Sequence, residues 1–419
     1  MTVSGIQTGS VRSRQSASIR WGAWFGDTDR ELTFPSGWTV SRCAPTDASD
    51  IGGSGVSEAL ANPIGVPRLR EIASGRRHPC VVIDDLSRPT PGHRLLPPVL
   101  AELDAAGIMP EEVTVLVGVA NHRPLMRADL LKKLGEEVMD RCRVRNHFSG
   151  ARCKEIGVTS RGTPVQLNED FLGSDLKVLV GSIIPHLSAG FSGGAKLVMP
   201  AVASIAAATA FHTGLSGPDD RIGVVETTAR RDAEEAGRMA GVDFIVNSVP
   251  TTHRGIAALV AGDLVSAHRK GVQMAQRIYA TSARAGVDIC VLSAYPKDNE
   301  FLQYSTAYAP LLSAPQPLVR PGGTVVVASA GSEGQGFHAL FGPGMRMWHG
   351  ASLPGNNSDL LLFSTGMRPG DLEAELRANA SLFTTWEETL VWLEAKHGSQ
   401  ASVSVFPSAV TQLVDKILP

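Results

Sequence analysis

The stretch from Gly181 to His212 gathers residues that can do chemistry: His186, His212 and Lys196 lie in a run made mainly of small and apolar residues. A histidine exchanges a proton near neutral pH, and its neutral imidazole also binds metal ions. A lysine that is kept away from water loses part of its affinity for a proton and becomes a nucleophile. The stretch is therefore a candidate for proton transfer, metal binding or covalent attachment.

Lys196 does not fit a phosphate-binding loop. It follows Gly190 at the spacing of the motif G-x-x-x-x-G-K-[ST], but Ala195 stands at the second glycine and Leu197 at the magnesium-binding hydroxyl. The pattern thus argues against a nucleotide triphosphatase. With Ala195, Leu197 and Val198 beside it, the lysine is placed for desolvation and covalent chemistry. A surface lysine that reaches from a loop into water is the alternative.

The neighbouring segments predict how this stretch is presented. Leu176–Pro185 is an apolar run of the length of a buried parallel strand. Gly193 and Gly194 lie in a turn that can bend tightly or approach a ligand closely. Ala201–His212 reads as an Ala-rich helix. A strand, a glycine-rich turn and a helix in this order place a ligand at the carboxyl edge of a sheet.

Two earlier strands, Cys80–Asp85 and Glu111–Ala120, alternate with helical segments and predict a parallel, doubly wound sheet. A turn or a helix cap explains polar residues after any one strand, but three successive loops favour a ligand site. The polar residues that follow the three strands are Asp85, Arg88, His122, Arg123 and His186.

Composition excludes several classes of protein. The chain has 419 residues, 43% hydrophobic and 19% charged, which is ordinary for a globular protein with two cores. A net charge of -2 gives no reason to expect nucleic acid or an anionic membrane as partner. No apolar run is long enough to span a membrane. Five scattered cysteines without a CxxC pair predict free thiols in a cytoplasmic protein and no structural zinc site.

The predicted fold class is α/β with two domains, an N-terminal Rossmann-like domain with a parallel sheet and a smaller C-terminal α/β domain. The hairpin expected at Trp21–Val40 opens the first domain, and the amphipathic pattern near the end predicts a closing helix. We expect a flexible leader at 1–20, a cofactor-binding domain at 21–275, a connector at 276–286, a second domain at 287–405 and the closing helix at 406–419.

The central stretch resembles the nickel-dependent lactate racemase family. Its motif P-H-x-x-A-G-F-S-G-G-x-K is matched from Pro185 to Lys196, and a later histidine is matched by His212. The family's D-x-[ST]-R-P is matched by the stretch from Asp85 to Pro89. Its T-H-R-P is matched from His122 onward, with Asn121 in place of the threonine.

The resemblance implies a nickel-pincer nucleotide (pyridinium-3,5-bisthiocarboxylic acid mononucleotide nickel) covalently tethered to Lys196, with His212 as a nickel ligand. Proteins that synthesise the cofactor would then be partners. The implied activity is racemisation or epimerisation of a 2-hydroxy acid by reversible hydride transfer, with His122 and His186 as the acid/base pair. The cofactor-binding residues that it implies are Lys196, Asp85, Ser87, Arg88, Gly193 and Gly194.

The expected substrate contacts include one departure from the family. Members bind the substrate carboxylate with a glutamine and a lysine three residues later; here Gln303 is present, but Thr306 stands at the lysine position. Tyr304, Lys297 or Tyr308 could compensate, and a substrate other than lactate is expected. The predicted substrate residues are Arg88, Arg123, Gln303 and Tyr304.

A later loop, Gly331–Phe341, loosely matches the family's E-G-x-G-x-x-F. His338, Trp348 and His349 lie on or near it, and an ordinary packing role is at least as good an interpretation of them as a functional one.

Three other functions stay open from the sequence. The same cofactor could serve another redox conversion of a hydroxyl-bearing substrate, or the chain could be a non-catalytic protein that binds the cofactor. Zinc-dependent hydrolysis through His122, His186 and His212 is the third, although it lacks a carboxylate or the spacing of HExxH.

Overall fold

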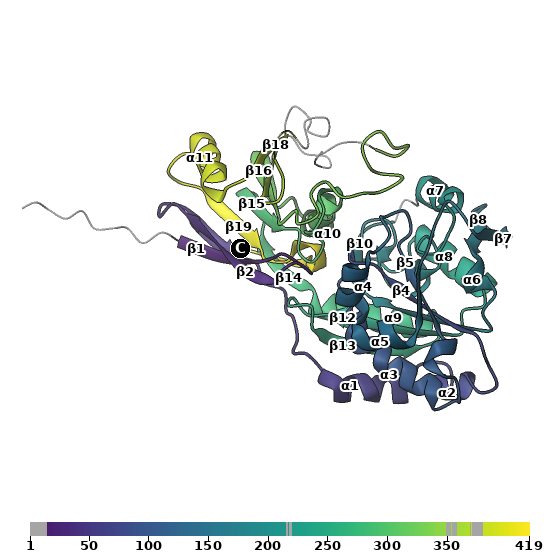
Figure 1. Cartoon of the computed structure of the whole chain (residues 1–419). Helices are drawn as coiled ribbons and strands as arrows, with labels where there is room; N and C mark the ends of the chain where they lie inside the picture. Colours follow the sequence, from purple (N-terminus) through teal and green to yellow (C-terminus); the bar gives the residue numbers. More distant parts are fainter. Residues whose placement is uncertain are drawn as a thin grey trace, which may run out of the picture.

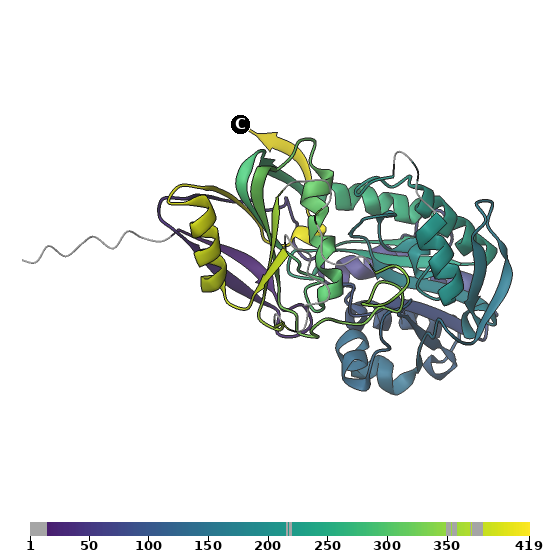
Figure 2. The same ribbon diagram turned by 90° about the horizontal axis from the view of Figure 1, so that it is seen from above.

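The computed structural model describes residues 15–214, 217, 220–348, 353, 358–368, 370 and 380–419. Two six-stranded sheets form two lobes that lie side by side (Figures 1 and 2). The predicted two-domain α/β fold is confirmed. No helix in the described part of the chain is long and apolar enough to cross a membrane.

The N-terminal sheet has the strand order β13-β12-β9-β4-β5-β6 and is parallel except for β13, which runs antiparallel to β12. From β4 the chain continues to β5 on one side and later returns to β9 on the other, so the connections change direction at β4. Open α/β sheets bind ligands at such a point. The strands are β4 (Pro79–Asp84), β5 (Thr114–Gly118), β6 (Arg143–Asn146), β9 (Leu176–Ser182), β12 (Phe244–Pro250) and β13 (Ile256–Gly262).

Helices cover both faces of this sheet, which explains its continuous apolar strands. In β4, Val81 and Ile83 pack in one core with α3, while Cys80 and Val82 pack in the other core with α7 and α8. The helices of this lobe are α1 (Gly52–Ala61), α2 (Leu69–Ile72), α3 (Gly92–Asp104), α4 (Arg127–Leu134), α5 (Glu136–Arg141), α6 (Glu169–Leu172), α7 (Ile205–Gly214), α8 (Thr228–Met239) and α9 (Ser266–Ile278), with a 3₁₀ turn η1 (Pro110–Glu112) and a small hairpin of β7 (Cys153–Val158) and β8 (Pro164–Asn168).

The C-terminal sheet is parallel throughout, in the order β18-β17-β16-β15-β19-β3. Its central strand β15 has the buried sequence expected of a strand that is covered on both faces. The elements are β15 (Val287–Ser293), the 3₁₀ helix η3 (Phe301–Tyr308), α10 (Ala309–Ser313), β16 (Val319–Ser329), β17 (Asp359–Ser364), β18 (Ala380–Phe383), α11 (Trp386–His397), β19 (Ser402–Phe406) and, from the start of the chain, β3 (Thr39–Arg42).

The start of the chain differs from the prediction. The hairpin of β1 (Gln15–Trp21) and β2 (Thr28–Phe34) begins inside the expected leader, and β3 pairs with β19. These strands therefore belong to the C-terminal lobe, although the prediction placed residues from 21 onward in the N-terminal domain. The cause is burial, because Trp21 and Phe34 pack in one core with Val403. The rest of the predicted leader, residues 1–14, lies outside the described residues.

The predicted closing helix at 406–419 is wrong. The segment forms a 3₁₀ turn η5 (Ala409–Thr411) and a strand β20 (Leu413–Leu418), which pairs in parallel with β14 (Ala280–Arg284). Its apolar spacing fits a helix, but β14 offers an open edge, and burial of Leu413 and Val414 there decides the conformation. The expected connector at 276–286 consequently contains a paired strand.

Candidate active site

A cavity of about 400 Å³ lies at the carboxyl ends of β4, β5, β9 and β15, so both lobes line it. Its size and its mixed apolar and polar walls are typical of a small-molecule site. The sequence-predicted residues that line it are Asp85, Ser87, Arg88, His122, His186, Gly193, Lys196, His212, Gln303 and Tyr304.

His122 forms an ion pair with Asp85, its Nδ1 lying 2.9 Å from Oδ2. Ser87 donates to the other carboxylate oxygen from its backbone N–H and its hydroxyl. Burial disfavours the charged form of each partner, but their mutual attraction outweighs it, so the pKa of His122 is raised and that of Asp85 is lowered. Asp85 therefore makes His122 the stronger base and leaves Nε2 available to a ligand.

A buried ion pair between Lys133 and Asp84 stabilises the loop that follows β4. Lys133, which is fully buried, donates to Asp84 Oδ1 at 2.7 Å and to the backbone oxygens of Asp85 and Arg88 at 2.7 and 3.0 Å. Lys133 therefore fixes the backbone from which Asp85 and Arg88 project. It lies on α4, and nothing in the local sequence marks it for this role.

His186 is held by the turn between the short strands β10 (Pro185–His186) and β11 (Gly190–Phe191). Its Nδ1 accepts from the backbone N–H groups of Ser188 and Ala189 at 3.3 and 3.2 Å. Burial, followed by the charges of nearby lysines, lowers the pKa of His186 well below its ordinary value. His122 and His186 thus have opposite tendencies, because the first holds a proton more strongly than a free imidazole and the second less strongly.

Lys196 lies in the 3₁₀ turn η2 (Gly194–Leu197) with 8% of its surface exposed. Its ammonium lies over the Phe211 ring at 4.8 Å and makes no hydrogen bond or ion pair with any described residue. Burial, assisted by the charges of Arg230 and Arg88, lowers the pKa of Lys196 well below its usual value. The desolvation expected from the sequence is therefore present, and a lowered pKa favours the nucleophilic form of an amine. Covalent chemistry at Lys196 stays a prediction.

His212 lies near the end of the predicted helix, α7, and borders the cavity. Its ring makes edge contacts with Phe211 and Phe341, at centroid distances of 5.5 and 5.3 Å. Burial lowers its pKa to about 3, so the imidazole is neutral and can bind a metal ion. Within the described ranges, no three His, Cys, Asp or Glu side chains are grouped to hold a metal, which leaves the three-histidine zinc site without geometric support.

Packing alone accounts for the predicted glycines. Gly193 and Gly194 have positive φ angles of 73° and 54°. A Cβ on Gly193 would lie 2.9 Å from Asn247 Oδ1, and one on Gly194 would lie 2.9 Å from His268 Cδ2. Gly193 borders the cavity, whereas Gly194 is not among the lining residues. The backbone N–H of Gly194 donates to Asn247 Oδ1 at 2.7 Å. Their contact with a cofactor stays a prediction.

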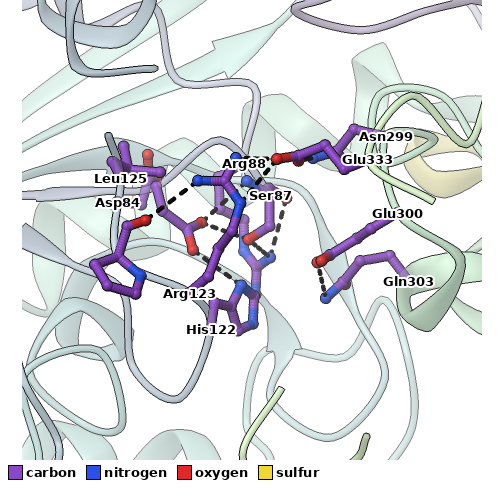
Figure 3. Close-up of polar contacts among 12 residues, drawn as sticks. Asp84, Ser87, Arg88, His122, Arg123, Leu125, Asn299, Glu300, Gln303 and Glu333 are labelled. Atoms are coloured by element: carbon purple, nitrogen blue, oxygen red, sulfur yellow. Dashed lines mark hydrogen bonds and ion pairs between the residues drawn. The ribbon is translucent and has the colours of Figure 1, made fainter. Parts of the chain in front are cut away.

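Arg123, a predicted substrate residue, is not among the residues that line the cavity. It pairs with Asp129 at 2.7 Å and with Glu333, whose other oxygen accepts from Asn299 (Figure 3). Glu333 and Asn299 come from the C-terminal lobe, so Arg123 connects the lobes beside the cavity.

Replacing Glu333 by glutamine should lower the free energy of unfolding by about 1 kcal/mol, because a partly exposed ion pair contributes little. Urea unfolding followed by circular dichroism measures this change. Glu137→Gln is the matched control, since Glu137 pairs with Arg141 on an exposed helix within one lobe, and its effect should be smaller. A larger loss at Glu137 would contradict the role of Glu333 between the lobes.

The predicted substrate segment forms η3, on the C-terminal side of the cavity. Gln303 Nε2 donates to Glu300 at 3.2 Å, and the Thr306 hydroxyl donates to the backbone oxygen of Gln303 at 2.7 Å. Tyr304 stacks on Phe301 with a centroid distance of 4.8 Å. Thr306 thus stands where the family has a lysine, and its hydroxyl is already used within the turn.

His338 is a cavity residue that sequence reasoning left as packing. Its ring lies 4.9 Å from that of His122, and the backbones of the two residues form an antiparallel bridge between the lobes. Burial, followed by the charge of His122, lowers the pKa of His338 to about 2, so it is a neutral hydrogen-bonding group. The loose E-G-x-G-x-x-F match was the signal that pointed to this loop. His349 lies outside the described residues.

Lys297 and Asn121 also line the cavity. Both side chains are almost completely buried, and neither polar atom of the Asn121 amide has a hydrogen-bond partner among the residues that the structure describes. The sequence marked Asn121 as a departure from the family and Lys297 only as one possible replacement for a missing cation.

Several known proteins resemble this chain in sequence. The profile of the lactate racemase N-terminal domain matches residues 25–223. The lactate racemase of Thermoanaerobacterium thermosaccharolyticum is 30% identical over 296 residues, and that of Lactiplantibacillus plantarum is 29% identical over 293 residues, with 68% of each chain covered in both cases.

Two solved structures share the fold. The lactate racemase apoprotein from Thermoanaerobacterium thermosaccharolyticum superposes with a TM-score of 0.75 at 23% identity, covering 96% of this chain and all of that one. A protein of Thermotoga maritima superposes with a TM-score of 0.63 at 17% identity, covering 88% of this chain and 99% of that one.

Proposed function

The chain belongs to the lactate racemase family, and from this premise we propose that it is an isomerase that racemises or epimerises a 2-hydroxy acid. The observation that carries the proposal is the convergence of His122, His186, Lys196 and His212 on one cavity. The test is a chirality assay on protein that is co-produced with the cofactor-making proteins. A pure enantiomer should be converted to a mixture of both, and conversion to an oxidised product alone would support a different redox reaction.

The residues present fit a nickel-pincer nucleotide. Lys196 is a buried amine without a polar partner in the described part of the chain, as a covalent tether requires. His212 is a neutral imidazole at the same cavity, and among the described residues no three His, Cys, Asp or Glu side chains are grouped to hold a metal by themselves, so the cofactor would have to supply the other donors. Lys196 would hold the nucleotide and His212 would bind the nickel. When bound, such a cofactor would accept a hydride from C2 of the substrate and return it to either face.

The two histidines would handle the hydroxyl proton. His122, made more basic by Asp85, takes or holds this proton on one side, and His186, with its lowered pKa, gives it up on the other. Arg88, which donates to the Ser87 hydroxyl at 2.8 Å, borders the space between them and offers a planar cation to a phosphate or a carboxylate. A protein that only stored the cofactor would not need this acid/base pair.

The pH dependence of kcat/KM should be bell-shaped with a broad plateau. A racemase needs one histidine protonated and the other neutral, and because its equilibrium constant is unity both enantiomers must give the same profile. The acidic limb follows His186, whose pKa is lowered, and the alkaline limb follows His122, whose pKa is raised. Activity is therefore lost as the pH falls through the pKa of His186 and as the pH rises through the pKa of His122.

Replacing Asp85 by asparagine should narrow the pH range over which kcat/KM is constant, by moving its alkaline limit to lower pH. Without the carboxylate, burial and the charge of Arg88 lower the pKa of His122 and only the charge of Glu300 opposes them, so the pKa falls and the alkaline limb moves by about one to three pH units to lower pH. Asp129→Asn, next to Arg123 and outside the cavity lining, should leave both limbs in place. An alkaline limb that Asp85→Asn does not move would separate His122 from the proton transfer.

We further propose that the preferred substrate is not lactate. The support is Thr306, whose hydroxyl is bonded within its own turn at the position where the family has a cation, so the substrate carboxylate has to be bound from another position than in the family. Comparing kcat/KM across a series of 2-hydroxy acids tests this, and a maximum at lactate would refute it.

A further inference from the structure

The side chain of Lys297 is buried without a counter-charge. It follows β15, is 2% exposed and lines the cavity. Its ammonium forms no hydrogen bond or ion pair with any residue that the structure describes. Burying an unpaired ammonium is costly, and proteins keep one where a ligand supplies the missing partner.

The surrounding charges show that the partner must come from outside the protein. Burial is the main cause that lowers the pKa of Lys297, and the cations Arg88 and Lys196 lower it further. Asp85 is near enough to oppose this effect, but its oxygens are engaged by His122 and Ser87. Glu300 also opposes it, but burial raises its own pKa, and it accepts a hydrogen bond from Gln303. Among the described residues, none supplies a free carboxylate to Lys297.

The position of Lys297 favours the substrate over the cofactor. The expected tether, Lys196, projects from the N-terminal lobe, whereas Lys297 lies on the opposite side with Gln303 and Thr306. Thr306 offers no charge there. Arg88 remains on the N-terminal side as a second cation without an ion pair in the described chain, where it can serve the nucleotide phosphate.

We propose that Lys297 binds the carboxylate of the 2-hydroxy acid and replaces the cation that is missing at Thr306. This inference rests on the proposed function for the identity of the ligand. The ammonium donates charge-assisted hydrogen bonds to the carboxylate, and the incoming anion favours the charged form of the lysine. The substrate's C2 would then lie between this anchor in the C-terminal lobe and the histidines of the N-terminal lobe.

The experiment compares the binding of lactate and of uncharged lactamide by calorimetry, on protein with and without cofactor. Lys297→Met should weaken lactate binding by about 10- to 100-fold, the loss of one hydrogen bond between charged groups, and should change lactamide binding little. Lys297→Arg should retain most of the preference for lactate. The double variant Lys297→Met with Thr306→Lys should recover it, which shows that the single variant fails for lack of charge and not for lack of folding.

Three results would overturn the assignment: wild-type protein that binds lactate no better than lactamide, equal loss of both ligands in Lys297→Met, or unchanged lactate binding in that variant. A lower fraction of nucleotide-modified Lys196 in Lys297→Met, with unchanged lactate binding, would assign Lys297 to the cofactor phosphate. The proposed function fails separately, if cofactor-loaded wild-type protein racemises no 2-hydroxy acid, and the lactate–lactamide comparison still decides the role of Lys297.

Discussion

Protein with Lys196 replaced by methionine should carry no covalent nucleotide and no racemase activity, even when it is produced together with the cofactor-making proteins. Methionine fills a similar volume but has no amine to form the tether. The fold should persist, because the Lys196 ammonium has only a ring contact with Phe211 to lose among the described residues. The measurement is the mass of the peptide that contains residue 196, followed by a chirality assay on the same preparation.

Two controls make this result specific. Lys177 is also a buried lysine with a lowered pKa, but it donates to the backbone of Ser174 and does not line the cavity, so Lys177→Met should keep the modification. His212→Ala should keep the added mass on Lys196 and lose nickel, which separates the tether from the metal ligand. A nucleotide-sized addition that persists in Lys196→Met would place the attachment elsewhere.

Much of the N-terminal lobe could be predicted because its information is local. The strands β4, β5 and β9 are continuous apolar runs, and each is followed directly by the polar residues that line the cavity. Parallel strands end at the same edge of a sheet, so the sequence predicts that His122 and His186 lie at one edge, although β4 separates their strands. The motif from Pro185 to Lys196 predicted the turn, and the structure explains its glycines by contacts with Asn247 and His268.

The elements that could not be predicted depend on partners far away in the chain. β3 has the same exposed and half-buried pattern as a loop, and only the open edge of β19 makes it a strand. β20 has helical spacing, and the edge of β14 overrides it. In both cases the hydrogen bonds that decide the conformation come from residues far away in the sequence, which the local pattern cannot reveal.

The site shows the same division. His122 was predicted from its loop. Its ion pair with Asp85 could not be predicted, because it depends on the pairing of β4 with β5. In sequence, Lys133 and Lys297 look like ordinary lysines of a helix and a loop. Only the structure shows that both are buried, which is what distinguishes them from surface lysines. Arg123 shows the opposite failure, since it is adjacent to His122 in sequence yet its side chain pairs with Glu333.

Replacing either of the two histidines proposed as the acid/base pair should have the second large effect on activity. His122→Asn and His186→Asn should each lower kcat by about 10²- to 10⁴-fold, the usual contribution of a positioned acid or base, while Lys196 remains modified. Both enantiomers should lose kcat/KM equally in each variant, because the equilibrium constant of racemisation is fixed at unity. As a control, replacing His93, an exposed histidine on α3 outside the cavity lining, by asparagine should leave the rate unchanged.

A single-turnover experiment separates the two histidines from one another. With His122→Asn, the remaining histidine can still accept the hydroxyl proton of the enantiomer that faces it, so rapid chemical quench should yield the 2-oxo acid from that enantiomer only. His186→Asn should give the 2-oxo acid from the opposite enantiomer, and the stronger base His122 should make that yield the larger one. The same enantiomer reacting in both variants would mean that the histidines serve one face, and that the Asp85–His122 pair positions the substrate instead of exchanging its proton.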